Sequence, residues 1–360
     1  MSKRSYTIKD YLRHRLDGHK PPLACSAETP EQFRDWRRQF IRRFRKALRR
    51  RPESVPLNPE TLMTRSLPGG VRAEKIVFNS SPAMSVPAWV LMPDDGATDI
   101  RRPAVFLIPG RTGNDVEPHG RVVDATSGKA WGVGLNPDGS PCSTRYHNDI
   151  GQALARAGFL VYCQDFLGFG ERAGTPEYMR NLWNHACNLV GQALVVFDEI
   201  DLAAVHYHDV VRGIDYLASR ADIDPRRIGM MGCSLGGMWT NNVAALERRV
   251  RVAVSCCSYS NLESHIFRKK LGLCAAQTVP GLAAFADLTA PLAAIAPKPL
   301  MMQVGRHDPG MAVEEAAAPC REVERLYAML GREERCAVDI FDGGHEIHVP
   351  AVIDWFRRWL

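Results

Sequence analysis

The sequence predicts an α/β fold with a mostly parallel, doubly wound sheet and helices on both of its faces. Three observations predict it. Short continuous apolar runs recur along the chain, as buried strands of a parallel sheet require. Segments with helical periodicity separate these runs, which favours strand–helix–strand crossovers. A serine flanked by glycines also stands at one predicted strand-to-helix turn, at residues 232–236.

The predicted elements begin with a pair of alternating segments. Residues 71–80 and 84–92 indicate a β-hairpin, and Pro87 favours a position at the edge of the sheet. The predicted buried strands that follow are 104–108, 159–164, 227–233, 251–256, 300–304 and 337–341. The predicted helices are 149–157, one long helix over 189–219, 235–247, 313–330 and 349–360.

Two connections are too long for simple turns. Residues 111–147 are rich in Gly, Pro, Asp and Asn, and residues 258–297 mix apolar and small side chains. Long ordered loops on a compact domain are commonly lids or binding loops. Both leave the sheet at strand ends, where ligands bind in such folds. We therefore expect one catalytic domain over 71–360 that carries both insertions beside its site.

Residues 1–70 are predicted to form a basic helical extension. Its segment 34–51 holds ten Arg or Lys and one Asp, a net charge of +9, so the other 342 residues carry −3 of the chain's +6. Apolar side chains recur there every four residues, which predicts an amphipathic helix: Trp36, Phe40, Phe44 and Leu48. We expect this stripe to pack on the main domain. Contact with an anionic surface or with a second copy in a homo-oligomer stays open; with no base-reading module, nucleic acid is not expected.

Composition and motif content argue against several other classes. No apolar run approaches the roughly 20 residues that span a bilayer, and the N-terminus lacks an apolar signal region. The ten cysteines are scattered without a Cys-x-x-Cys pair, which predicts reduced thiols in a cytoplasmic protein. No phosphate-binding or dinucleotide motif is present, so no cofactor is expected. The histidine clusters at 206–209 and 345–348 lack the spacing of a zinc site, so no metal is expected either.

The pentapeptide 232–236, Gly-Cys-Ser-Leu-Gly, follows a predicted strand and precedes a predicted helix. In this place the Gly-x-Ser-x-Gly pattern predicts a nucleophile elbow, a strained turn that exposes the serine hydroxyl above the sheet. An ordinary glycine-rich turn is the alternative. The following helix directs its N-terminal dipole at developing negative charge. We therefore predict that Ser234 is the nucleophile, and we treat Cys233 as a packing residue.

The last two predicted strands end beside residues that could activate this serine. A serine nucleophile needs a base to take its proton and a further group to orient the base. Asp308 and His345 follow these two strands, so both emerge at the same edge of the sheet as Ser234. Asp342 is an alternative acid. It shares a loop with His345, however, and a carboxylate on a separate strand end reaches the far ring nitrogen more easily.

Four further residues are candidates for the site. An oxyanion requires two N–H donors that are in place before charge develops. Leu235, directly after the serine, and Arg111, in the loop after strand 104–108, are predicted to supply them. Glu171 and Arg172 have two interpretations: they form an ion pair that braces a loop, or Arg172 binds a carboxylate of the substrate.

With these residues assembled, the chain resembles the α/β-hydrolase superfamily, and more narrowly the bacterial dienelactone hydrolases and acetyl xylan esterases. The resemblance covers roughly residues 70–360. Besides the triad it rests on three stretches: Asp-Phe-Leu-Gly-Phe-Gly-Glu-Arg at 165–172, Ala-Pro-Lys-Pro-Leu at 296–300 and Phe-Asp-Gly-Gly-His at 341–345. It implies the α/β-hydrolase fold and hydrolysis of a small-molecule ester through an acyl-enzyme, with Ser234, Asp308 and His345 as nucleophile, acid and base.

Other activities stay open at this point. Leu235 stands where glucuronoyl esterases carry Arg, which argues against that activity. The same triad would also serve an amidase, a peptidase or a carbon–carbon bond hydrolase. A binding protein that kept the fold and lost turnover is a further alternative.

Overall fold

The structure is a computed structural model that describes residues 7–48, 50–97, 100–110, 134–135, 141–142, 149–169, 172, 186–259, 263 and 275–360. Its centre is a nine-stranded sheet in the order β1-β2-β3-β7-β4-β8-β9-β10-β11. These strands are β1 Glu60–Leu67, β2 Val71–Ser81, β3 Met84–Pro93, β4 Arg102–Ile108, β7 Leu160–Gln164, β8 Ile223–Cys233, β9 Val250–Cys256, β10 Leu300–Gly305 and β11 Cys336–Phe341. Neighbours from β1 to β7 pair antiparallel, and neighbours from β7 to β11 pair parallel. The predicted α/β sheet is confirmed.

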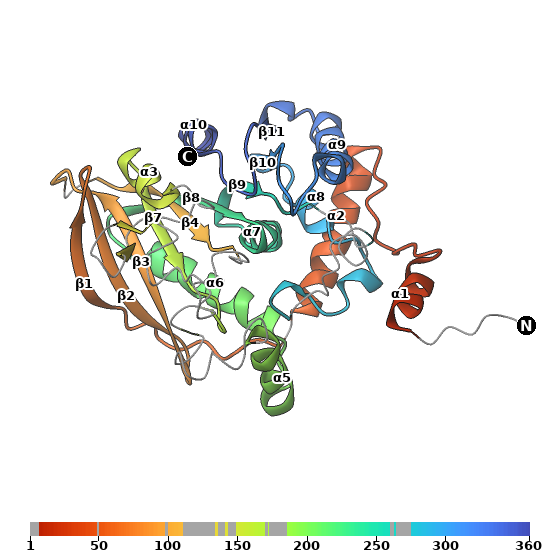
Figure 1. Cartoon of the computed structure of the whole chain (residues 1–360), viewed down its shortest axis with the longest axis horizontal. Helices are drawn as coiled ribbons and strands as arrows, with labels where there is room; N and C mark the ends of the chain where they lie inside the picture. Colours follow the sequence, from red (N-terminus) through yellow and green to blue (C-terminus); the bar gives the residue numbers. More distant parts are fainter. Residues whose placement is uncertain are drawn as a thin grey trace, which may run out of the picture.

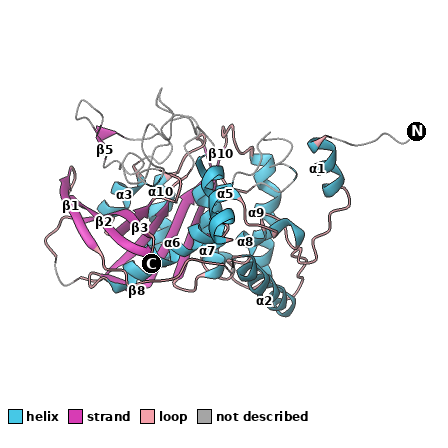
Figure 2. Cartoon of the chain, turned by 90° about the horizontal axis from the view of Figure 1, so that it is seen from below, coloured by secondary structure: helices cyan, strands magenta, loops and turns pink. Residues whose placement is uncertain are grey.

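Helices cover both faces of the sheet. On one face lie α3 (Ile150–Arg156) and α10 (Val349–Trp359); on the other lie α6 (Leu202–Ser219), α7 (Leu235–Leu246), α8 (Ala290–Ala293) and α9 (Val313–Met329). Figures 1 and 2 show them packed along the strands. Side chains of a strand alternate between the two cores, so Phe106 packs with α6 and its neighbour Val105 packs with α3.

The remaining described elements lie around this frame. They are α1 (Ile8–Leu16), α5 (Ala186–Asp198), the two-residue strands β5 (Gly134–Leu135) and β6 (Pro141–Cys142), and 3₁₀ turns at Ala275–Gln277, Leu282–Ala284 and Glu333–Arg335. Helix α1 lies at the periphery in both views. Apart from β5 and β6, the predicted insertion 111–147 lies outside the described residues. No helix in the described ranges is long and apolar enough to cross a bilayer.

Helix α2 (Pro30–Ala47) packs on the main domain, as the sequence predicts. Thr29 caps it by accepting the N–H of Gln32. Pro30 occupies the first turn, where a backbone N–H would have no acceptor within the helix, so the N–H that proline lacks is not lost from the helix. Its aromatic stripe is buried and belongs to the same core as α6 and α7. Phe40 stacks on Trp36 with ring centroids 5.4 Å apart. The stripe is therefore enclosed within the chain.

The sheet also differs from the prediction. It begins at Glu60, eleven residues before the expected start of the domain at residue 71, because β1 pairs with β2. Strand β3, which holds Pro87, is an interior strand and not the predicted edge. Its pairing with β7 starts only at Ala88, so Pro87 lies outside the ladder between β3 and β7.

The predicted long helix 189–219 is two helices, α5 and α6. The break falls at Glu199, which has a positive φ of 53°, and Asp201 is the residue before α6. A left-handed residue cannot continue a right-handed helix. Periodicity alone missed the break because the apolar pattern continues on both sides of it.

Candidate active site

Ser234 occupies a strained turn between β8 and α7, with φ 59° and ψ −119°. Its N–H donates to the carbonyl of Cys256 at 2.9 Å. A Cβ on Gly236 would lie 2.1 Å from the carbonyl oxygen of Ile108, and a Cβ on Gly232 would lie 2.4 Å from the backbone of Gly236. Only glycine permits such approaches. Backbone contacts with β4 and β9 therefore hold this turn in its unusual conformation.

Asp308 and His345 are in direct contact. His345 Nδ1 lies 2.7 Å from Asp308 Oδ2. The other carboxylate oxygen accepts the N–H groups of Gly310, at 2.7 Å, and Met311, at 3.0 Å. The Asp308 side chain has no exposed surface, whereas 27% of the His345 side chain is exposed. The carboxylate is therefore fixed in orientation, and part of the imidazole stays accessible.

A close crossing of two backbones brings these residues together. A Cβ on Gly305, the last residue of β10, would lie 2.0 Å from the carbonyl oxygen of Gly344. The N–H of His307 also donates to Gly343 at 2.9 Å. The loop after β11 thus lies directly on the end of β10, which places His345 next to the residues that follow β10.

Asp342, the alternative acid of the sequence analysis, lies elsewhere. Its Oδ1 is 2.8 Å from His307 Nε2, and both side chains are largely exposed. The carboxylate that contacts His345 is that of Asp308. This arrangement follows the argument that a carboxylate from a separate strand end reaches the ring more easily.

The charges of the pair reinforce each other. Burial lowers the pKa of His345, but hydrogen bonds to Asp308 and Cys257 outweigh it and raise the pKa to about 9. Burial raises the pKa of Asp308, but its hydrogen bond with His345 leads the interactions that bring it below the ordinary value. The carboxylate is therefore ionised, and Nδ1–H of the imidazole donates to it. Nε2 is then the basic nitrogen of the neutral ring.

Cys257, which follows β9, is a residue that the sequence analysis did not identify. Its Sγ lies within 4.8 Å of ligand atoms of both Asp308 and His345. It adopts a positive φ of 49°, which is uncommon outside glycine. Contact with Cys233 and then burial raise the pKa of its thiol well above the ordinary value, so the thiol is neutral near pH 7. Its position directly after a predicted strand, at the same sheet edge, was the available signal.

The same three side chains could also hold a metal ion. In the described part of the chain, Cys257, Asp308 and His345 form a cluster of thiol, carboxylate and imidazole groups, the donor types that zinc prefers. An ion there would occupy the ring and carboxylate that proton transfer requires. His206 and His208 do not converge: their Nε2 atoms lie 3.2 Å from the carbonyl of Leu167 and 2.9 Å from that of Ser80.

The predicted oxyanion donors are only partly described. Leu235 is the first residue of α7, so its N–H has no acceptor within the helix. Arg111 lies outside the described residues, which end at Gly110 in that loop. The end of β4 nevertheless touches the serine turn through the contact of Ile108 with Gly236.

Arg172 has a carboxylate partner that the sequence did not suggest. Its Nη1 lies 2.7 Å from Oδ2 of Asp209 on α6, and both side chains are almost fully buried. Nη1 also donates to the carbonyl of Asp165 at 3.1 Å. Glu171, the predicted partner, lies outside the described residues. The described contacts thus brace the loop after β7 against α6, and Asp209 already balances the charge of Arg172.

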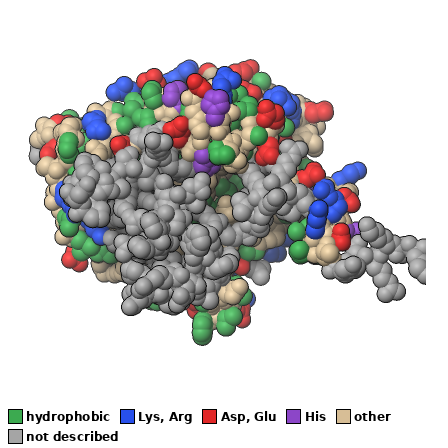
Figure 3. Space-filling model, in the orientation of Figure 1, with side chains coloured by type: hydrophobic (Ala, Val, Ile, Leu, Met, Phe, Trp, Pro, Cys, Tyr) green, Lys and Arg blue, Asp and Glu red, His purple; other side chains and the backbone are tan. Residues whose placement is uncertain are grey.

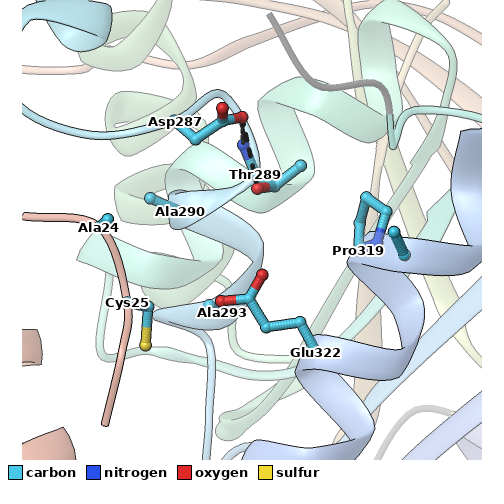
Figure 4. A pocket seen from close by; sticks show the side chains of 9 residues that line it. Ala24, Cys25, Asp287, Thr289, Ala290, Ala293, Pro319 and Glu322 are labelled. Carbon is cyan, nitrogen blue, oxygen red and sulfur yellow. Dashed lines mark hydrogen bonds between the residues drawn. The ribbon is translucent and has the colours of Figure 1, made fainter. Parts of the chain in front are cut away.

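A separate cavity of about 310 Å³ lies between the N-terminal segment, α8 and α9 (Figure 4). Cys25, Asp287 and Glu322 line it. Burial raises the pKa of Cys25 to about 11, so its thiol is protonated near neutral pH. No histidine that could activate the thiol is among the described residues that line the cavity. The cavity therefore lacks the chemistry of the Ser234 turn.

Family comparisons agree with this architecture. A model of the Abhydrolase family matches residues 3–251, so the chain belongs to that family. A model of the Prolyl oligopeptidase family matches residues 199–345. The Bacillus subtilis (strain 168) protein named "Putative hydrolase YtaP" is 29% identical over 213 residues, which are 58% of this chain and 67% of that protein. The chain covers 54% of the Salmonella typhi protein YfhR, at 28% identity.

Solved structures extend the likeness in fold over nearly the whole chain. A "putative acetyl xylan esterase" from Bacteroides fragilis NCTC 9343 has a TM-score of 0.72 at 18% identity, over 94% of this chain and 83% of that one. A glucuronoyl esterase from Solibacter usitatus has a TM-score of 0.60 at 13% identity, over 99% of this chain and 98% of that one. The α/β-hydrolase fold predicted from the sequence is confirmed.

Proposed function

We propose that this member of the α/β-hydrolase family is a serine hydrolase that cleaves a carboxylic ester through an acyl-enzyme on Ser234. The observation that carries the proposal is the 2.7 Å contact between His345 Nδ1 and Asp308 Oδ2, at strand ends of the sheet edge where Ser234 occupies its strained turn. A nucleophile, a base and an orienting acid from separate loops are the components of triad catalysis.

In the proposed mechanism, Nε2 of neutral His345 takes the proton of Ser234 as Oγ attacks the ester carbonyl. The Nδ1–H group donates to Asp308, which holds the ring and stabilises its charged form. The oxyanion is bound by the N–H of Leu235 and, in our proposal, by that of Arg111. The alcohol leaves with the proton from His345, and a water activated by the same ring then releases the acid.

Cleavage of an amide or peptide bond with the same residues is the second candidate. The match of residues 199–345 to the Prolyl oligopeptidase family favours it. We place the ester first because the solved structures with a similar fold are named as esterases. One of these structures is a glucuronoyl esterase. We do not propose that activity, because Leu235 stands where glucuronoyl esterases carry Arg.

Matched substrates test the proposal. Wild type, Ser234→Ala and Ser219→Ala are assayed with p-nitrophenyl acetate and with p-nitroacetanilide, which share an acetyl group and differ in the scissile bond. Ser219 is a matched control because its Oγ donates to the carbonyl of Tyr216 at 2.8 Å at the end of α6, before β8 begins, whereas Ser234 follows the end of β8. We expect ester hydrolysis in wild type and in the control, with loss of at least about 10³-fold in Ser234→Ala. Equal rates in all three proteins would remove Ser234 from the mechanism, and faster cleavage of the anilide would favour the amidase.

A further inference from the structure

Helix α2 carries more positive charge than its packing requires. An open cavity of about 780 Å³, here called the arginine groove, runs along its polar side. Phe33, Ile41, Pro297 and Leu330 supply its apolar lining. Every other residue that lines it is an arginine: Arg34, Arg37, Arg38, Arg42, Arg45, Arg248 and Arg332. No carboxylate side chain stands among these described lining residues, so the groove has seven cations and no anion.

Among the residues that the structure describes, most of these arginines have no carboxylate partner. Arg34 pairs with Glu31 at 2.6 Å and Arg38 with Asp35 at 3.1 Å, in both cases within the helix. Of the seven, only these two form ion pairs within the described ranges of the chain. Cations gathered in this way repel one another unless an anion joins them. The groove therefore has unused capacity for negative charge.

Backbone contacts hold two of the unpaired cations in position. Arg37 Nε donates to the carbonyl of Ala294 at 2.7 Å, and Arg45 Nη2 donates to that of Leu246 at 3.0 Å. Burial lowers the pKa of Arg37, and the neighbouring charges of Arg248 and Arg45 lower it further. Carbonyl groups orient a guanidinium but do not neutralise it. These side chains are thus arranged before any ligand arrives, which reduces the entropy cost of binding.

We propose that the arginine groove is a binding site for a small organic anion that joins two or more phosphate groups to an apolar ring or chain. The planar guanidinium fork matches phosphate oxygens, often with two hydrogen bonds at once. Ile41 and Leu330, which are both partly exposed, offer the apolar part a surface beside the charges. The volume lies within the roughly 300–1,000 Å³ typical of small-molecule sites.

The surroundings favour a small ligand over a membrane. The aromatic side chains of α2, including Trp36 and Phe40, are buried in the core and are not available to enter a bilayer. On the described part of the face in Figure 3, basic side chains lie among acidic ones. The seven arginines of the groove instead share one concave site of ligand size.

The groove is also separate from the proposed reaction site. Arg45 binds the last residue of α7, Leu246, while Ser234 precedes the first. A helix of 12 residues is about 18 Å long. Binding in the arginine groove can therefore be measured without ester hydrolysis, and the inference does not depend on the proposed function.

Calorimetric titration tests it with four probes: ATP, tripolyphosphate, adenosine, and vesicles of phosphatidylglycerol. The test variant is Arg42→Gln/Arg248→Gln. The control, Arg43→Gln/Arg226→Gln, loses the same charge elsewhere: Arg43 lies over the ring of Phe285, and Arg226 is exposed and paired with Asp224. Thermal unfolding of each protein verifies its fold. Arg42→Lys/Arg248→Lys, which keeps the charge but not the fork, gives a second reading if the Gln variant does not fold.

We expect wild type to bind ATP more tightly than tripolyphosphate, and adenosine not at all. The Gln variant should raise the Kd for ATP at least tenfold, the Lys variant by less, and the control by no more than about twofold. Absence of heat with both phosphate probes would overturn the proposal. Equal weakening in the test and control variants would replace it with non-specific attraction, and binding to vesicles alone would replace it with a membrane contact.

Discussion

The pKa of His345 determines where the proposed hydrolysis begins on the pH scale. Only the neutral ring can accept the proton of Ser234, and its contacts with Asp308 and Cys257 raise its pKa to about 9. The neutral fraction therefore grows as pH rises through that value. We expect kcat/KM for p-nitrophenyl acetate to increase from pH 6 to pH 9 in wild type. A rise in kcat/KM that is already complete by pH 6.5 would contradict the contacts that raise the pKa of His345.

The Asp308→Asn variant tests whether Asp308, and not Asp342, is the acid that orients His345. The amide no longer holds the ring in one tautomer or stabilises its charged form, so we expect kcat to fall by about 10³–10⁴-fold. The rise of the pH–rate profile should also move to lower pH, because the hydrogen bond with Asp308, which raises the pKa of His345, is lost. Asp342→Asn is the matched control, since Asp342 contacts exposed His307 instead. The assignment fails if the two variants lose activity equally.

Cys257 is expected to act as a positioning residue. Its thiol lies against the Asp308–His345 pair and contributes to the raised pKa of His345. Cys257→Ala should therefore shift the limb of the pH–rate profile to lower pH, with a loss in kcat of less than about tenfold. Cys257→Ser, which retains a hydrogen-bonding group, should restore much of the shift. Profiles of both variants that superimpose on wild type would show that the thiol only packs.

Among the elements, α2 is held to the domain by its aromatic stripe. Phe40 is fully buried and packs on Trp36 and Phe285. Phe40→Ala should lower the free energy of unfolding by about 3–5 kcal/mol through lost burial and the cavity left behind. Exposed Gln39→Ala, on the same helix, should change it by no more than about 0.5 kcal/mol. Urea unfolding measures both. A small effect of Phe40→Ala would mean that α2 docks weakly.

The crossing between β10 and the His345 loop should tolerate no side chain at Gly305. A methyl group there would meet the Gly344 carbonyl at 2.0 Å, and only a shift of the loop can relieve the clash. Gly305→Ala should therefore reduce kcat/KM at least about 100-fold while the protein stays folded. Gly344→Ala, whose Cβ would meet nothing within 4 Å, is the control in the same loop. Full activity of Gly305→Ala would show that His345 does not depend on this crossing.

For the whole molecule, the order of elements was predictable because local patterns determine it. Buried parallel strands such as β4 are continuous apolar runs, and helix α7 follows its serine turn directly, so neither requires knowledge of distant contacts. Strand β1 was missed because all eight of its residues are at least partly exposed, so its apolar pattern is weak; pairing with β2 creates the strand. The break at Glu199 depends on one backbone angle, which periodicity does not encode.

The site was predictable to the extent that topology determines it. Residues that follow the carboxyl ends of neighbouring parallel strands must meet at one edge, which is where the chain places Ser234, Asp308 and His345. Contacts that depend on side-chain direction were not predictable. Cys257 against the histidine and Asp209 against Arg172 both come from elements whose mutual orientation the sequence does not state.

The most direct test of the account is to find the residue that a fluorophosphonate labels. Such a probe reacts with a serine only when a base and an oxyanion site activate it. We predict one adduct per chain of the wild type by intact mass, located by peptide mapping at Ser234, and none on Ser234→Ala. Labelling of Ser234→Ala to the same extent, or an adduct on another residue of the wild type, would contradict the proposed catalytic serine.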